Sequence, residues 1–167
     1  MTIPWRSTAA VLALLLVLPA LADDSAANAF FERLAGAWRG SGEVNRMTGD
    51  IQMQWETVLD GQFRRLSMEN RMTGKNGETR HFRAQAFYRV AEDGSITGIC
   101  FDSRGYSLPL SGRVDGDVLT VEWGTADIER GRSTYRLAGD ALEVTDHVYA
   151  KDGALNAFGH TRLTRVK

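Results

Sequence analysis

Polar and apolar residues alternate along several runs of the chain. This is the pattern of a β-strand with one face in a core and the other in water. In one run apolar residues alternate with polar ones, Ile51, Met53 and Trp55 against Gln52, Gln54 and Glu56. The same alternation recurs in three later runs, 82–90, 118–123 and 142–148. Parallel strands are covered on both faces and read as continuous apolar runs, so this alternation predicts an antiparallel sheet.

Turn residues divide the chain after Gly36 into ten such runs. Nine breaks, most of them a Gly beside Asp or Asn, lie 8 to 17 residues apart. Hairpin turns require positive φ, which Gly adopts freely and Asn or Asp tolerate, so these breaks predict hairpins. The predicted strands are 38–46, 51–59, 62–73, 79–91, 95–103, 106–114, 117–123, 127–137, 141–150 and 154–166.

One helix is predicted ahead of the strands, over 25–35, because its apolar residues recur at helical spacing and Ser25 can cap its first turn. Ten sequential antiparallel strands exceed what an open twisted sheet holds comfortably, and closing the sheet removes both edges. The predicted fold class is therefore all-β, an up-and-down antiparallel β-barrel of about ten strands with a short N-terminal helix. A two-sheet sandwich is the alternative, and the lack of a long crossover connection argues against it.

The N-terminal residues have the three parts of a secretory signal peptide. Arg6 supplies the positive region, residues 9–18 form an apolar run, and Ala20-Leu21-Ala22 is a small-x-small cleavage site. As a helix that run would span about 15 Å, half of a bilayer's hydrocarbon core, which disfavours a membrane anchor. We predict a signal peptide over 1–22, cleavage near Ala22, a single β-barrel domain over 23–167, and a periplasmic or secreted protein without a membrane span.

Composition narrows the classes of function. The 167 residues are 43% hydrophobic and 25% charged, as in a globular domain. Lys+Arg (20) nearly balances Asp+Glu (21), which argues against a nucleic-acid partner. Cys100 is the single cysteine, so no intramolecular disulfide can form, and its apolar neighbours predict a buried, inert thiol.

Catalytic motifs are missing from the sequence. There is no Gly-x-Ser-x-Gly elbow, no glycine-rich phosphate loop and no paired cysteine. The histidines, at 81, 147 and 160, lack metal-ligand spacing. We therefore predict a protein that is not an enzyme and that needs no cofactor.

The segment Gly36-Ala37-Trp38-Arg39-Gly40-Ser41-Gly42 opens the first strand directly after the helix. Nine predicted hairpins follow this Gly-x-Trp motif. With them, the chain resembles the calycin group of lipocalins, fatty-acid-binding proteins and their relatives over about 130 residues. The longer Gly-x-Trp-x-Gly-x-Gly resembles nitrobindin-like haem-binding barrels, which are ten-stranded, and small lipocalin-like domains of exported bacterial proteins. We expect Trp38 to plug the narrow end of the barrel, and Gly40 and Gly42 to let the strand bend where the barrel closes.

The nitrobindin-like resemblance implies a haem iron held by a histidine near the C-terminus, and His160 is the residue in the matching place. Val44 stands where that family has a third glycine. Strand alternation groups His160 with Phe158 and Arg162, while Gly159 and Leu163 belong to the smoother apolar face. This pattern predicts that His160 points away from the interior.

The preferred function is an exported lipocalin-like barrel that binds a small hydrophobic or amphipathic molecule. The candidate ligand-binding residues are the interior-facing Trp38, Trp55, Tyr88, Trp123 and Asp146. A buried carboxylate needs a partner, so an interior arginine is expected beside Asp146, and such a pair could hold an acidic head group. The candidate partners are Arg64, Arg65, Arg132 and Arg136. The alternatives are a haem-binding barrel with His160 as iron ligand and a ligand-free interaction module of the cell envelope.

Overall fold

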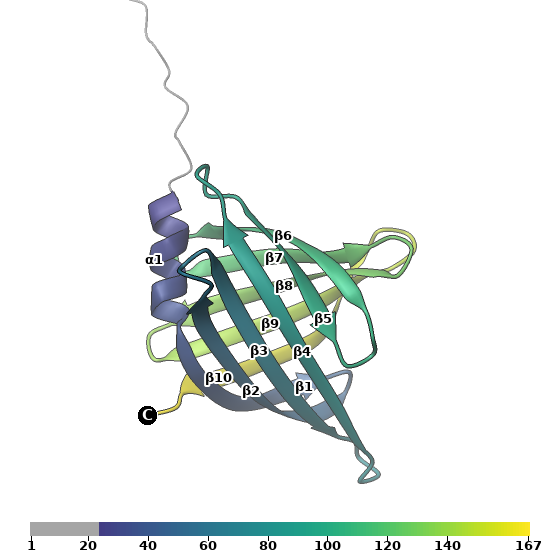
Figure 1. Cartoon of the computed structure of the whole chain (residues 1–167). Helices are drawn as coiled ribbons and strands as arrows, with labels where there is room; N and C mark the ends of the chain where they lie inside the picture. The colour runs from purple at the N-terminus through teal and green to yellow at the C-terminus, as the bar shows by residue number, and fades with distance from the viewer. Residues whose placement is uncertain (1–23) are drawn as a thin grey trace, which may run out of the picture.

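One helix and ten strands make up residues 24–167, the part of the chain that this computed structural model describes (Figure 1). The predicted signal peptide and its cleavage site lie outside these residues. None of the helices within 24–167 is long and apolar enough to cross a membrane. The elements are α1 (Asp24–Leu34), β1 (Gly36–Val44), β2 (Met47–Val58), β3 (Phe63–Thr73), β4 (Thr79–Val90), β5 (Ile96–Asp102), β6 (Ser107–Asp115), β7 (Val118–Thr125), β8 (Glu129–Ala138), β9 (Ala141–Tyr149) and β10 (Leu155–Arg165).

Every strand pairs antiparallel with the strand before and after it, and β1 pairs with β10 to close the barrel. The predicted fold class is confirmed, and the sandwich alternative is wrong. Closure at β1 and β10 runs from Trp38 opposite Arg165 to Val44 opposite Gly159. The predicted helix matches α1 to within one residue at each end.

Two glycines make the closing seam possible. A Cβ on Gly40 would lie 2.0 Å from the carbonyl oxygen of Arg162, and one on Gly42 would lie 2.1 Å from that of His160. No side chain fits at such distances, so β1 approaches β10 this closely only because both positions are glycine. The glycines thus lie at the closure, as predicted, and what they provide there is the close approach of β1 to β10.

The first hairpin differs from the prediction. A turn was expected at 48–50, but the chain turns at Asn45 and Arg46, both with positive φ (52° and 63°). Asn tolerates this conformation, so the turn forms without glycine. Gly49 lies instead within β2 on the inner wall, where a Cβ would stand 2.9 Å from Oδ1 of Asn70.

Helix α1 closes one end of the barrel (Figure 1). Its Phe30 and Phe31 are buried, and the Phe31 ring lies 6.0 Å from the rings of Trp55 and Tyr88. Trp38 is 1% exposed. Its indole N–H donates to the carbonyl oxygen of Leu34, the last residue of α1, at 2.8 Å. The Arg165 guanidinium lies 4.3 Å from the centre of the Trp38 ring. Trp38 therefore fixes the helix to the closing seam, a structural role.

Candidate functional site

The five predicted ligand-binding residues all face the interior, but they lie in two groups. Trp38, Trp55 and Tyr88 belong to the main core beneath α1. The Trp55 and Tyr88 rings stack with their centres 5.5 Å apart, and Tyr135 meets Trp55 edge-on at 5.4 Å. These rings form a layer that contacts Phe31 of α1, and we call it the aromatic floor. Burial raises the pKa of Tyr88 and of Tyr135, so both hydroxyls stay protonated.

Trp123 and Asp146 lie nearer the turns opposite α1, where Trp123 packs against the edge of the main core. Ser133 joins the two side chains. The indole N–H of Trp123 donates to Oγ of Ser133 at 3.1 Å, and the Ser133 hydroxyl donates to Oδ1 of Asp146 at 2.6 Å. Gly131 makes room for the indole, because a Cβ there would lie 2.1 Å from the Trp123 ring. The sequence analysis missed Ser133, although its position, two residues before the inward-facing Tyr135, carried the signal.

No arginine neutralises Asp146 among the bonds of residues 24–167. Arg64 donates to Asn28 and to the carbonyl oxygen of Gly61, Arg65 pairs with Glu56, and Arg132 bonds Glu122 and Tyr149, while Arg136 is exposed on the outer wall. The predicted interior arginine partner is therefore wrong. Strand alternation places Arg65, Arg132 and Arg136 outside, and Arg64 lies at the helix end of β3.

The Asp146 carboxyl therefore lies on the inner wall without an arginine partner among residues 24–167. Burial raises its pKa, and the hydrogen bond from Ser133 and the neighbouring His147 only partly oppose this. Its second oxygen, Oδ2, lies 3.1 Å from the place that a Cβ of Gly159 would take. Within residues 24–167 that oxygen receives no hydrogen bond.

Asn70 is a second polar residue on the inner wall, and the sequence analysis did not single it out. It is 7% exposed, and its Oδ1 is buried without a hydrogen-bond partner in the described residues. It follows Leu66 and Met68 on the inward face of β3. Buried polar atoms are nearly always paired, so an unpaired one marks a place where a water or a ligand is expected.

The inner wall opposite α1 is less completely covered than the core under α1. Most of the core side chains under α1 are 0–4% exposed, with Val90, Val114 and Leu137 partly buried at its edge. Opposite α1, several inward-facing residues of the strands keep part of their surface exposed: Met68, Phe82, Cys100, Trp123, Asp146 and Val148. We call this half of the interior the open half.

A small apolar cluster and one arginine border the mouth of the open half. Val44, Met47 and Met72 are packed with Phe82 and Phe158. Methionine side chains are flexible and can repack around a guest molecule. The mouth is thus lined by side chains that can adapt.

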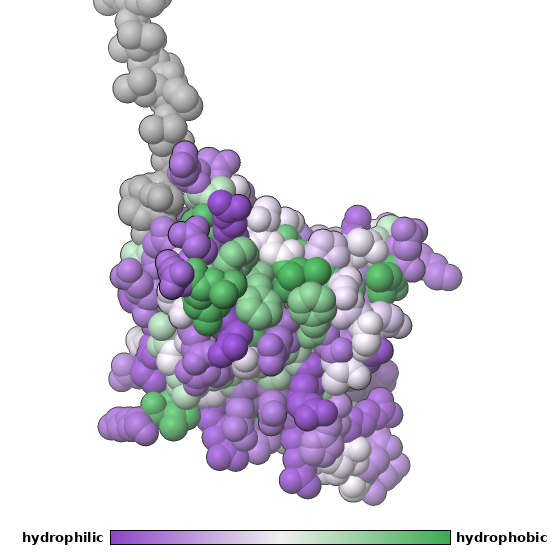
Figure 2. All heavy atoms as spheres, viewed as in Figure 1, coloured by the Kyte–Doolittle hydropathy of each residue, from purple (hydrophilic) through white to green (hydrophobic). Residues whose placement is uncertain are grey.

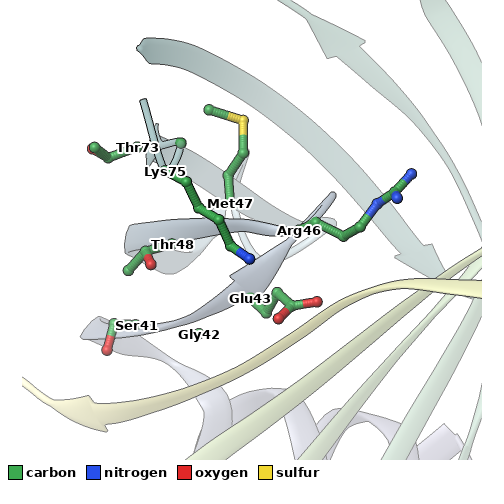
Figure 3. A pocket seen from close by; sticks show the side chains of 9 residues that line it. Ser41, Gly42, Glu43, Arg46, Met47, Thr48, Thr73 and Lys75 are labelled. Atoms are coloured by element: carbon green, nitrogen blue, oxygen red, sulfur yellow. The ribbon is translucent and has the colours of Figure 1, made fainter. Parts of the chain in front are cut away.

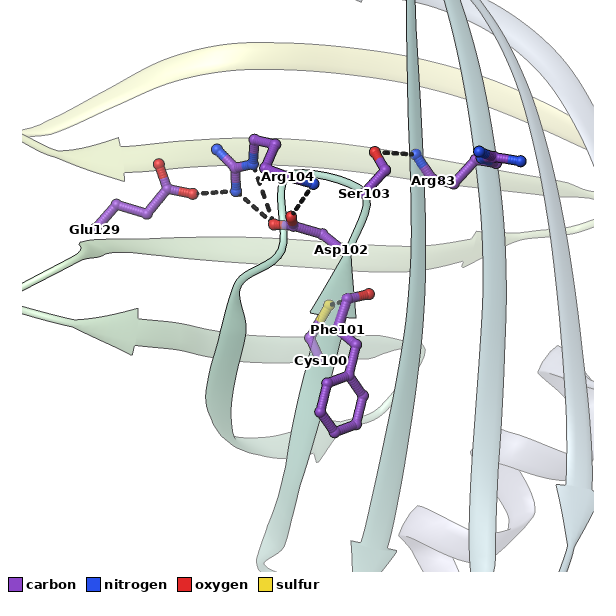
Figure 4. Close-up of polar contacts among 7 residues, drawn as sticks. All are labelled: Arg83, Cys100, Phe101, Asp102, Ser103, Arg104 and Glu129. Atoms are coloured by element: carbon purple, nitrogen blue, oxygen red, sulfur yellow. Dashed lines mark hydrogen bonds and ion pairs between the residues drawn. The ribbon is translucent and has the colours of Figure 1, made fainter.

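Arg104, in the loop after β5, lies between the carboxylates of Asp102 and Glu129, as Figure 4 shows. It donates to Oδ2 of Asp102 at 2.7 Å and joins the β5–β6 loop to the start of β8 through Glu129. Its guanidinium also lies 5.5 Å from the centre of the Phe82 ring. Burial opposes ionisation of Asp102, but the hydrogen bonds from Arg104 lower its pKa overall. Arg104 therefore links two loops to the aromatic side chain at the mouth.

A bulge in β10 separates two residues that the sequence analysis placed on one face. The pairing of β10 with β9 shifts register between Ala157 and Gly159, so Phe158 is an extra residue. Its ring meets Trp123 edge-on at 6.5 Å, which corrects the predicted orientation of Phe158. His160 is exposed on the outer wall, where its Nδ1 lies 3.3 Å from the Thr145 hydroxyl. An iron bound to His160 would therefore lie outside the barrel.

Cys100 faces inward on β5 and is partly buried. Burial and the nearby Asp102 raise the pKa of its thiol to about 11. A raised pKa disfavours the thiolate, which agrees with the predicted inert character, but the predicted burial of Cys100 is only partial.

Two pockets open on the outside of the barrel, and none of the five predicted ligand-binding residues lines either one. The first, of about 610 Å³, lies between the β1–β2 and β3–β4 turns and is bordered by Glu43, Arg46 and Lys75 (Figure 3). The second, of about 740 Å³, lies near α1 and is bordered by Arg64 and Arg89. Both are rim features, and the first shares Met47 with the mouth of the open half.

The outer wall carries an apolar patch on the side of β4 and β5, visible in Figure 2. On β5, Ile99 and Phe101 are exposed, Phe101 by 46%, and Tyr106 is exposed in the following loop. Ile99 pairs with Phe87 on one side and with Pro109 on the other. We call Phe87, Ile99, Phe101 and Pro109 the outer patch.

Comparison with known proteins supports the architecture. No family model matches the chain, and no curated protein matches its sequence. Among solved structures, the crystal structure of Rv2717c from M. tuberculosis superimposes with a TM-score of 0.64 at 19% sequence identity. The match covers 84% of this chain and 98% of that one. At this identity the similarity establishes the fold alone, and the chain shares the fold of Rv2717c.

Proposed function

We propose that this protein is a lipocalin-like carrier that binds a small, mostly apolar molecule in the open half of its barrel. The observation that carries the proposal is the difference in side-chain burial between the core under α1 and the open half. Beneath α1 most core side chains are buried. Opposite α1 the inner wall keeps exposed surface and two oxygens, Oδ2 of Asp146 and Oδ1 of Asn70, that accept no hydrogen bond from residues 24–167. An apolar lining with a few convergent polar groups is the usual composition of a small-molecule site.

The surroundings of the open half fit a carrier. The aromatic floor provides a rigid base, and the methionines at the mouth provide an adaptable entrance. The resemblance of the Gly36–Gly42 segment to calycins supports the same reading. We further propose that the protein is exported, on the strength of the signal-peptide pattern over residues 1–22.

Native mass spectrometry tests the proposal directly. The full chain is expressed in a bacterial host and purified from the periplasm without detergent or solvent. We expect the mass of a polypeptide that begins at Asp23, together with a bound molecule of a few hundred daltons whose mass is lost on denaturation. A bare polypeptide, before and after incubation with a lipid extract of the host, would refute ligand binding. A cytoplasmic, uncleaved chain would refute export independently.

The outer patch favours a second candidate function, contact with another protein of the envelope. Exposed apolar side chains in a contiguous group often mark interaction sites. The β4 neighbours Arg83 and Arg89 flank the patch, so the partner we propose has acidic residues around an apolar centre. A photo-crosslinking amino acid at Phe101 should then trap one defined protein, whereas the same probe at the exposed His160 should not. Equal crosslinking at both positions would contradict this function.

A further inference from the structure

We propose that the ligand carries a head group that donates hydrogen bonds and bears no negative charge, an amine or an alcohol, and that Asp146 accepts from it. This inference rests on the proposed function and specifies its ligand class. It reverses the expectation of an acidic head group, because that expectation required an arginine beside Asp146. The argument comes from the hydrogen bonds of the open half.

The first step concerns the hydrogen bonds that Ser133 already makes. Its hydroxyl hydrogen goes to Oδ1 of Asp146, and its oxygen already accepts the indole N–H of Trp123. A serine hydroxyl has one hydrogen to donate, so Ser133 has none left for a ligand. The Trp123 indole has a single N–H, and that is also used.

The second step concerns the unpaired acceptors of the open half. Oδ2 of Asp146 lies beside the place that a Cβ of Gly159 would take, and Oδ1 of Asn70 is buried without a partner among residues 24–167. The indole N–H of Trp55, which is also unpaired among these residues, lies in the main core. Both acceptors are oxygen atoms on the inner wall of the same half. A ligand that donates hydrogen bonds would satisfy them, whereas a ligand with acceptors only would leave them unpaired, at a cost in affinity.

The third step is charge. The arginines considered as partners of Asp146 bond elsewhere or lie on the outer wall. A carboxylate or phosphate head group would therefore meet Asp146 without a counter-charge, and like charges repel strongly when shielded from water. An ammonium group would instead form a charge-assisted hydrogen bond with Oδ2.

A set of three probes with one alkyl chain isolates the head group. Decylamine, decan-1-ol and decanoate are titrated into the purified protein by isothermal calorimetry at neutral pH, below their aggregation limits. We expect decylamine to bind most tightly, decan-1-ol next, and decanoate roughly tenfold or more weaker than decylamine. Binding of all three with equal affinity, or tightest binding of decanoate, would overturn the inference and leave the proposed function intact.

Two variants assign the preference to Asp146. Asp146→Asn keeps an oxygen that can accept from Ser133 but removes the carboxylate, so decylamine should lose about tenfold in affinity and decanoate should gain. The control is Glu143→Gln, a carboxylate on the same strand that faces outward and pairs with Arg162. It should leave all three affinities unchanged. An unchanged preference in Asp146→Asn would overturn the role of Asp146, and no binding of any probe would count against the proposed function itself.

Discussion

The two halves of this barrel are built from the same ten strands but differ in what fills them. Under α1, helix side chains enter the barrel and meet Trp55 and Tyr88, so little inner surface stays exposed. Opposite α1 no helix of residues 24–167 enters, and glycine, serine and polar side chains replace large apolar ones at several inward positions, among them Gly131, Ser133 and Asp146. The comparison shows how one sheet can support both a stabilising core and the proposed ligand site.

The largest expected effect is on the free energy of unfolding, which an alanine substitution should lower more in the core under α1 than in the open half. Phe30→Ala removes a 0% exposed ring of α1 from the packed core, and it should destabilise the fold by about 3–5 kcal/mol. Phe82→Ala makes the same change at the mouth, where the ring is partly exposed, and should cost less than about 2 kcal/mol because less burial is lost. Urea unfolding of the two variants measures both. Equal losses would contradict the division into a filled and an open half.

An intermediate effect, in the opposite direction, is expected at Asp146. Burial raises the pKa of this carboxyl, so the folded protein holds the proton to higher pH than the unfolded chain does. Stability should therefore fall as pH rises from the unfolded pKa, about 3.9, to the raised folded value, and should then level off. Asp146→Asn removes this loss, so the variant should be more stable than the parent by about 1–3 kcal/mol at neutral pH.

Thermal unfolding between about pH 4 and about pH 8 measures this difference. The groups around Asp146 that titrate are His147, Tyr88 and Tyr135, and both tyrosines have raised pKa values, so they stay neutral across this range. Asp140→Asn, in an exposed turn, is the control and should keep the parent's pH dependence. A variant at Asp146 that is less stable than the parent at neutral pH would show that the carboxylate is well paired.

The smallest effect on stability is expected at the mouth. Arg104 is 43% exposed, so Arg104→Ala should cost only about 1 kcal/mol. It also unlinks the β5–β6 loop from β8, and decylamine should therefore dissociate several-fold faster in a stopped-flow experiment. Arg39→Ala, which removes an exposed pair with Asp50 on the outer wall, is the matched control and should leave dissociation unchanged. If both variants behaved alike, Arg104 would have no part in the entrance.

Much of the fold was predictable because it depends on local signals. Alternation and turn chemistry gave all ten strands, and the inward positions of Trp123 and Asp146 followed from strand parity. The turn at Asn45 and Arg46 was missed because neither residue is glycine. Gly49, which was predicted to be a turn residue, lies on the inner wall instead. Parity shows which side a residue faces, but it does not distinguish turn glycines from wall glycines.

The site was predictable only in part, since its hydrogen bonds join strands that are distant in sequence. Ser133 and Asn70 look like ordinary polar residues until the barrel closes around them. The bulge at Phe158 depends on the pairing of β10 with β9, and it reverses parity over a single residue. The position of Arg104 between Asp102 and Glu129 depends on two loops meeting, and no single segment encodes that.

The most direct test of the account places the ligand in one half. Residues 24–167 contain three tryptophans, Trp38 and Trp55 in the filled half and Trp123 in the open half, and each can be labelled as 5-fluorotryptophan. Titration with decylamine, followed by ¹⁹F NMR with signals assigned through single Trp→Phe variants, should shift the Trp123 resonance most and leave that of Trp38 in place. Trp55, whose ring belongs to the floor, should shift less than Trp123. Shifts at Trp38 and Trp55 with Trp123 unmoved, or no shift at any of the three under saturating decylamine, would contradict binding in the open half.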